Sequence, residues 1–200
     1  LALSAPPRPA DALLVEVEGQ DGRPRLRLSA NVAGAGMNGR VVELANESNK
    51  EWGGLVTFAS ATVRAVIERR ITEVAVRYRL QNGIEQQWTG RLAASFFANG
   101  AYCGNGMWLG RGGSMQDGQF EMTLIPELPA LRMLVGVPRL YLGTVDRIPE
   151  VVRATVVNVE LSSSSRDVMV DLDGELAGHL PLKIRMIPKV LLVATGLADF

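Results

Sequence analysis

Residues that commonly build metal centres and nucleophilic triads are scarce in this chain. Its 200 residues include one cysteine, Cys103, and one histidine, His179. A single cysteine cannot close an internal disulfide bond, and one cysteine with one histidine cannot supply the ligands of a zinc site. Nothing near His179 in the sequence indicates a serine or cysteine nucleophile. The composition therefore argues against zinc-dependent and triad-type hydrolases, and it favours a reducing compartment.

The chain also lacks an excess of charge and a long hydrophobic run. Twenty-one Lys and Arg residues balance twenty-one Asp and Glu residues, so no overall field attracts nucleic acid or anionic lipid. No apolar segment approaches the roughly 18 to 20 residues of a membrane-spanning helix. The longest candidate, Val190–Leu197, is interrupted by Thr195 and Gly196. We expect a soluble, cytoplasmic protein with no nucleic-acid partner, and peripheral contact with a membrane stays open.

Two nucleotide-binding signatures are absent as well. Gly34-Ala35-Gly36 lacks the third glycine of a dinucleotide fingerprint, and no G-x-x-x-x-G-K-[ST] sequence occurs. Residues 1–12 are rich in proline and alanine, which is typical of a linker or of the truncated lead of a longer polypeptide. We therefore expect a single domain over residues 13–200, long enough to bury one hydrophobic core.

Alternating apolar and polar residues predict many short strands. A glycine-containing turn at 19–22 and the Asn82-Gly83 pair predict two hairpins. Helical spacing predicts one helix within Trp52–Glu68 and a second from about Glu127 to Val135 or beyond. We expect strands or mixed alternating runs at 13–17, 25–28, 73–80, 85–95, 119–125, 141–144, 151–161, 167–172, 183–186 and 190–194. The predicted fold class is mainly β (α+β), an antiparallel β-sandwich-like domain with about two helices.

Two Asp-Gly turns carry the carboxylates that could perform chemistry. Glu175 follows Asp173-Gly174 at the end of an expected strand, where a carboxylate can accept the proton of a substrate hydroxyl during phosphate transfer. The loop Ser114–Gln119 contains Asp117 and offers the oxygen ligands that magnesium prefers. From the residues alone, an ordinary turn is the better interpretation of both loops.

An apolar segment in the middle of the chain is interrupted by glycines. Phe96–Met107 reads FFANGAYCGNGM, with glycines at 100, 104 and 106. Such a change from strand-forming residues to glycine favours a tight turn or a close approach of the backbone to another group.

Taken in order, these segments resemble the C-terminal half of the diacylglycerol kinase and sphingosine kinase family. Residues 31–38 resemble the strand and turn at the start of that domain, and 96–107 resemble its glycine turn. Asp117-Gly118 and Asp173-Gly174-Glu175 then follow in the family's order. The resemblance implies a β-rich sandwich that supplies a lipid pocket and closes over an N-terminal nucleotide-binding domain.

The resemblance also implies roles for individual residues. Glu175 matches the proton acceptor for the hydroxyl of a lipid substrate, either diacylglycerol or a sphingoid base, with ATP as co-substrate. The apolar face of the helix over 55–67 would help to line an acyl-chain channel, although core packing is the better interpretation for most of its residues. The remaining implied sites are cofactor contacts at Asp173 and Gly174, and a structural Mg²⁺ site at Ser114, Asp117 and Gln119.

The chain departs from the family's pattern in three places. Leu109–Gly113 stands where family members carry proline and alanine, and Asn38 stands where they carry an acidic residue. The family's G-G-D-G-T nucleotide loop, which belongs to the N-terminal domain, does not occur. We therefore expect the chain alone to be inactive. We favour the lipid-binding half of a lipid kinase over a non-catalytic lipid-binding module and over a β-sandwich interaction domain.

Overall fold

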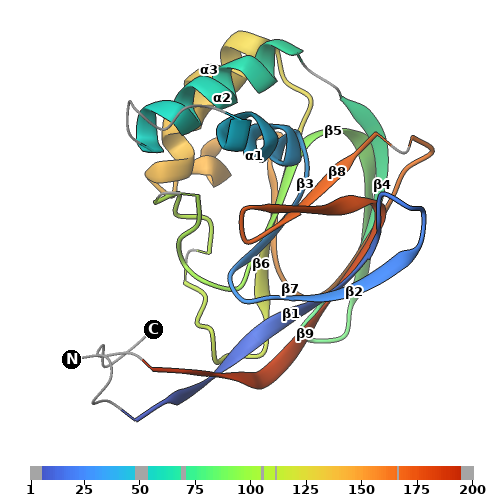
Figure 1. Ribbon diagram of the computed structural model, residues 1–200, viewed down its shortest axis with the longest axis vertical. Coiled ribbons are helices and arrows are strands. Elements are labelled where there is room, and N and C mark those ends of the chain that lie inside the picture. Colours follow the sequence, from blue (N-terminus) through green and yellow to red (C-terminus); the bar gives the residue numbers. More distant parts are fainter. Residues whose placement is uncertain are drawn as a thin grey trace.

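Nine strands form one antiparallel sheet that closes on itself. The computed structural model describes residues 6–47, 54–68, 71–104, 106–110, 112–165 and 167–194. The strand order is β2-β1-β9-β8-β3-β5-β4-β7-β6, and additional pairings of β9 with β7 and of β5 with β6 give a barrel-like sandwich (Figure 1). The strands are β1 (Arg8–Glu18), β2 (Pro24–Ser29), β3 (Val32–Gly36), β4 (Thr72–Leu80), β5 (Glu85–Ala98), β6 (Phe120–Pro126), β7 (Val152–Ser162), β8 (Met169–Leu172) and β9 (Glu175–Val193).

The predicted fold class and both predicted hairpins are confirmed. The turn at 19–22 joins β1 to β2, and Asn82-Gly83 lies in the turn between β4 and β5. The start of the first strand differs from the prediction. β1 begins at Arg8, and Ala10, Asp11 and Ala12 are fully buried. Residues 8–12 therefore belong to the sheet and not to a linker, because they pair with the end of β9.

Strand alternation fills the space inside the sheet with large apolar side chains. Phe97 and Phe120 meet edge to face, with ring centroids 6.4 Å apart. Leu13, Leu182 and Ile184, from strands that pair with one another, are almost fully buried in the same cluster. Each of these side chains contributes roughly 1.5–3 kcal/mol by leaving water. This cluster, rather than any helix, is the main core of the domain.

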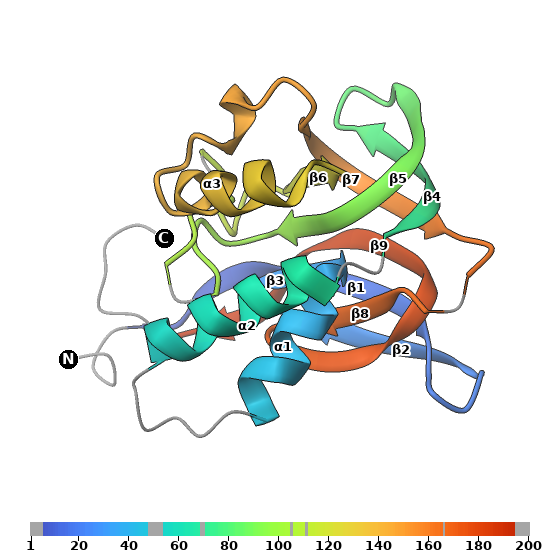
Figure 2. The same ribbon diagram turned by 90° about the horizontal axis from the view of Figure 1, so that it is seen from above.

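Three α-helices occur in the described part of the chain, and Figure 1 shows them together at one end of the sheet. They are α1 (Met37–Glu47), α2 (Gly54–Glu68) and α3 (Ala130–Tyr141). In Figure 2, α1 lies beside β3 and β8 and α3 beside β5 and β6, whereas α2 packs against α1 and α3. None of the described helices has both the length and the hydropathy that crossing a membrane requires.

The expected pair of helices is present, but α1 is an additional helix. Its buried residues Val41 and Leu44, with Met37 before them, follow helical spacing directly after a strand. The expected alternating run at 141–144 is wrong, because Tyr141 ends α3 and a 3-10 turn, Val145–Arg147, follows.

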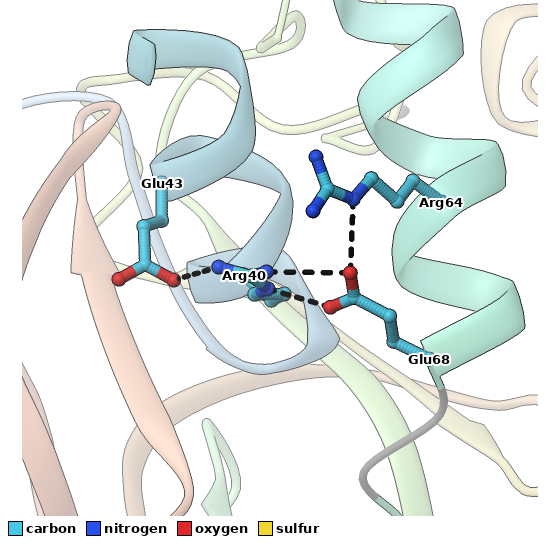
Figure 3. A network of polar contacts seen from close by, with 4 residues as sticks. All are labelled: Arg40, Glu43, Arg64 and Glu68. Atoms are coloured by element: carbon cyan, nitrogen blue, oxygen red, sulfur yellow. Dashed lines mark hydrogen bonds and ion pairs between the residues drawn. The ribbon is translucent and has the colours of Figure 1, made fainter.

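A network of charged side chains connects α1 to α2 (Figure 3). Arg40 of α1 donates hydrogen bonds to Glu43 of its own helix and to Glu68 of α2, with Nε 2.8 Å from the Glu68 carboxylate. Arg64 donates to the same carboxylate from one turn earlier in α2. Hydrogen bonds from Arg40 and Arg64 lower the pKa of Glu68, so the carboxylate stays ionised at neutral pH.

Candidate functional site: a cavity between the helices and the sheet

A cavity of about 150 Å³ lies between the three helices and the sheet. Its walls are almost wholly apolar, and they include Val41 of α1, Val66 of α2, Leu140 of α3 and Phe96 of β5. Small ligands generally bind in such concave, apolar sites with a few convergent polar groups. The helices therefore form one side of a site that the sheet alone does not enclose.

One buried carboxylate lines this cavity. Asp171, in the middle of β8, is 6% exposed, and its Oδ1 has no hydrogen-bond partner. The cavity is also lined by Asn38 of α1, whose Nδ2 donates to the carbonyl oxygen of Ser95 at 2.6 Å. A buried acceptor without a partner is costly, so this oxygen is available to a donor that enters the cavity.

A glycine in β3 makes room for these two polar side chains. Gly34 pairs with Asp171 in the sheet. A Cβ atom at position 34 would lie 2.6 Å from both Asn38 Nδ2 and Asp171 Oδ1. Any larger residue would displace both side chains, so Gly34 is what allows them to lie next to the same point of the strand.

The environment of Asp171 disfavours its charged form. Burial raises the pKa of this carboxyl from 3.8 to about 7, a hydrogen bond from its own backbone amide partly opposes the rise, and the charge of Asp173 adds to it. Burial likewise raises the pKa of the Cys103 thiol to about 12, with a further contribution from Asp171. Cys103 lines the cavity, and as a neutral thiol it is not a nucleophile there.

The Asp173-Gly174 pair forms the turn between β8 and β9. Both residues have positive φ, 51° and 87°, as a tight hairpin turn requires. The Asp173 carboxylate accepts hydrogen bonds from the backbone amides of Ala30, Asn31 and Val32 at 2.8–3.0 Å, and from the Ser29 hydroxyl. Asp173 therefore fixes the connection between β2 and β3.

Of the Asp173-Gly174-Glu175 tripeptide, only Gly174 lines the cavity. Glu175 is the next residue, the exposed first position of β9. Glu175 pairs with Leu172, next to Asp171. The sequence-predicted tripeptide thus lies beside the buried carboxylate.

The Asp117 loop lies apart from the cavity. Its carboxylate accepts hydrogen bonds from the backbone amides of Ser114 and Gln119, at 3.0 and 3.1 Å. The buried carboxylate of Asp11 accepts from the amide of Gly118 in the same loop and from the amide of Lys189. Within the described ranges, no group of three or more His, Cys, Asp or Glu residues could hold a metal ion.

The glycine-rich segment after β5 is a tight turn, as the sequence predicted. The amides of Gly106 and Met107 both donate to the Cys103 carbonyl oxygen, and the amide of Cys103 donates to the Met107 carbonyl oxygen. Cys103 and Met107 are buried and line the cavity. The turn therefore supplies part of the cavity wall.

Only part of the apolar face of α2 lines the cavity. Thr62 and Val66 line it, whereas Val63 and Ile67 are 44% and 71% exposed. The side chains of Leu55 and Phe58, which the prediction also included, lie outside the described residues.

Asp171 is the main feature that the sequence analysis missed. The available signal was a carboxylate between two apolar residues, Val170 and Leu172, in a short strand of which three residues are buried. Charged residues are rarely buried without a partner, so this position could have been singled out from the pattern alone.

Comparison with known proteins confirms the family resemblance that the sequence indicates. Residues 31–195 match the family described as the YegS C-terminal NAD kinase beta sandwich-like domain. The chain belongs to this family. No curated protein matches its sequence.

Solved structures agree on the YegS C-terminal domain fold. A proposed diacylglycerol kinase from Bacillus anthracis is similar over 96% of this chain and 57% of its own length, with a TM-score of 0.64 and 15% identity. Another diacylglycerol kinase from the same organism is similar over 97% of this chain and 56% of its own length, with a TM-score of 0.58 and 12% identity. A yeast NADH kinase with bound NADH covers 96% of this chain and 45% of its own length, with a TM-score of 0.50 and 12% identity. The chain thus spans little more than half the length of these diacylglycerol kinases.

Proposed function

We propose that this chain is the lipid-binding C-terminal half of an ATP-dependent lipid kinase that phosphorylates a lipid hydroxyl, with diacylglycerol or a sphingoid base as substrate. The observation that carries the proposal is the apolar cavity whose polar residues lie beside the Asp173-Gly174-Glu175 turn. An apolar chain fits the wall between α1 and α3, and a hydroxyl fits the end at which carboxylates are available.

Glu175 is the residue we assign as proton acceptor. It is exposed at the start of a strand, where a second domain can bring a phosphate donor to it. A carboxylate at hydrogen-bond distance from the lipid hydroxyl can take its proton as phosphate is transferred. We assign Asp173 and Gly174 to positioning Glu175, since the Asp173 carboxylate is already bound by three backbone amides.

The nucleotide belongs, in this proposal, to an N-terminal domain that supplies the phosphate-binding loop. ATP and its accompanying Mg²⁺ would bind there, and the chain alone would be inactive. The loop gives little support to the structural ion predicted at Ser114, Asp117 and Gln119, which stays a prediction. Both carboxylate oxygens of Asp117 accept backbone amides, and a single carboxylate is a poor donor set for Mg²⁺. We assign Asp117 to closing its own turn.

A non-catalytic lipid-binding module is the second candidate. The exposed position of Glu175 favours this second candidate, because an exposed side chain is not fixed against the cavity. In that case the cavity would bind an amphiphile with no phosphate transfer. Peripheral contact with a membrane is compatible with both candidates.

The test joins this chain to a nucleotide-binding domain and measures ATP-dependent phosphorylation of mixed lipids. We expect phosphorylation that falls at least about 100-fold in Glu175→Gln, as for loss of a general base. A matched control is Glu16→Gln, which changes an exposed glutamate of β1 that pairs with Lys183 and does not line the cavity. Equal activity of Glu175→Gln would overturn the assigned role, and lipid binding without any phosphorylation would favour the binding module.

A further inference from the structure

The polar end of the cavity contains hydrogen-bond acceptors and negative charge without a matching cation. Asp171 Oδ1 is buried without a partner, and Asp173 and Cys103 are close enough to Asp171 to affect its charge or to be affected by it. Of the described residues that line the cavity, Arg132 is the one with a positive side chain. Both of its terminal nitrogens donate to the Glu150 carboxylate, at 2.7 and 3.1 Å.

We propose that Asp171 is a specificity-determining residue, which accepts a hydrogen bond from the ligand and restricts the cavity to amphiphiles with an uncharged or cationic donor group. This inference rests on the proposed function and narrows its substrate class to lipids with a second donor group, because the proton of the phosphorylated hydroxyl goes to Glu175. A hydroxyl or an ammonium group satisfies Asp171 Oδ1, whereas a carboxylate or phosphate leaves it unpaired.

Burial makes this selection strong. Two negative charges in a region of low dielectric repel each other much more than they do in water. A terminal carboxylate placed at the polar end of the cavity would face Asp171, and Arg132 is already bound to Glu150. An ammonium group would instead form an ion pair with the ionised carboxylate, in addition to the hydrogen bond that a hydroxyl also donates.

The size of the cavity sets the probes. At about 150 Å³, it is comparable to an engineered apolar cavity that binds benzene. Six-carbon probes with three different ends therefore suit it: 1-hexanol, hexylammonium and hexanoate. They share one apolar chain, so differences in affinity report on the polar end alone.

The experiment measures the affinity of the three probes for the chain at pH 8 by NMR titration. We expect hexylammonium to bind at least about ten-fold more tightly than 1-hexanol, and hexanoate at least about ten-fold more weakly. Asp171→Asn should remove both differences to within about three-fold. The control Asp167→Asn, an exposed aspartate just before β8, should leave all three affinities unchanged.

A second measurement needs no substitution. As the pH falls below about 7, Asp171 takes up a proton, so the affinity for hexylammonium should fall toward that for 1-hexanol. The other titratable groups that face this end are Asp173, Cys103 and Tyr141, and burial together with Cys103 also raises the pKa of Tyr141. Cys103 and Tyr141 are both neutral throughout this pH range, so they do not produce the change in hexylammonium affinity.

Three results would overturn the inference: no binding of any probe, hexanoate binding as tightly as 1-hexanol, or charge discrimination that persists in Asp171→Asn. These results are separate from the kinase test. A chain that discriminates by charge but supports no phosphorylation would overturn the proposed function alone. An active kinase without charge discrimination would overturn the role of Asp171 alone.

Discussion

Two aspartates of one hairpin, separated by a single residue, have opposite environments. Asp173 lies in the turn, and backbone amides and a hydroxyl surround its carboxylate. Asp171 lies in the strand, buried at the cavity wall, and its Oδ1 has no partner. The difference follows from the local geometry, because the turn exposes one side chain to the adjacent β2–β3 connection and the strand directs the other toward the helices.

This difference separates a structural carboxylate from one available to a ligand. An aspartate that accepts several amides has its hydrogen-bonding capacity used by the fold, so substitution should affect stability first. A buried aspartate without a partner lowers stability and becomes favourable when a donor binds. Sequence motifs direct attention to Asp173, but the unpartnered group is Asp171.

The largest effect that would sharpen this comparison is the dependence of stability on pH. Because the folded-state pKa of Asp171 is raised from 3.8 to about 7, the folded state retains a proton that the unfolded state has lost. Its contribution to stability is therefore present below pH 3.8 and is lost as the pH rises to about 7. The total is at most about 4 kcal/mol.

Asp171→Asn removes this titration. We expect urea unfolding to show the variant gaining about 2–4 kcal/mol relative to the unmodified chain between pH 4 and pH 8. A constant difference across that range would mean that Asp171 is not buried in a way that perturbs its charge.

Replacing the turn aspartate should have the opposite sign and a slightly smaller size. Asp173→Ala removes the acceptor of three amides and one hydroxyl, and it places alanine at φ 51°. We expect a loss of about 2–3 kcal/mol in the free energy of unfolding. Asp173→Asn, which keeps one acceptor oxygen and tolerates this conformation, should lose roughly half as much. Unchanged urea midpoints in both variants would contradict the structural role.

A third substitution fills the space that Gly34 leaves for the side chains of Asn38 and Asp171. Gly34→Ala places a Cβ atom 2.6 Å from Asn38 Nδ2 and Asp171 Oδ1. We expect a loss of about 1–3 kcal/mol from overpacking, together with weaker binding of six-carbon probes. Ala33→Gly, in the same strand, is the control for a general change in β3. Full probe affinity in Gly34→Ala would show that neither polar side chain contacts the ligand.

The smallest expected effect concerns the ion pairs that join α1 to α2. Arg40→Met keeps most of the apolar stem and removes the hydrogen bonds to Glu43 and Glu68. Because the pair is near solvent, we expect a small decrease in melting temperature that disappears at 1 M salt. A large decrease that salt does not change would show that packing of the Arg40 stem, and not charge, holds the helices together.

Much of the fold followed from the pattern of residues. Alternation located most strands, and Asn82-Gly83 located a hairpin, because these signals depend on local backbone geometry. The α1 helix was missed because the preceding glycine-rich strand dominates the local composition. The start of β1 was missed because Pro and Ala residues resemble a linker until β9 pairs with them.

The site was predictable in part. The Asp173-Gly174 turn and the glycine turn at 96–107 were identified from sequence, because each requires positive φ at defined positions. The burial of Asp171 was not, because it depends on Gly34 in a distant strand and on helices that pack over both. The flanking Val170 and Leu172 indicate a buried strand, but they do not show that Asp171 Oδ1 lies at a cavity without a partner.

The most direct test of the account is to map where an amphiphile binds. Amide chemical-shift changes on addition of 1-hexanol should cluster on α1, α3, β8 and the turn that contains Cys103 and Met107, with Asp171 among the most affected residues. Changes on strands β1 and β2, which do not line the cavity, with none around it would contradict the central claim that this cavity is the ligand site.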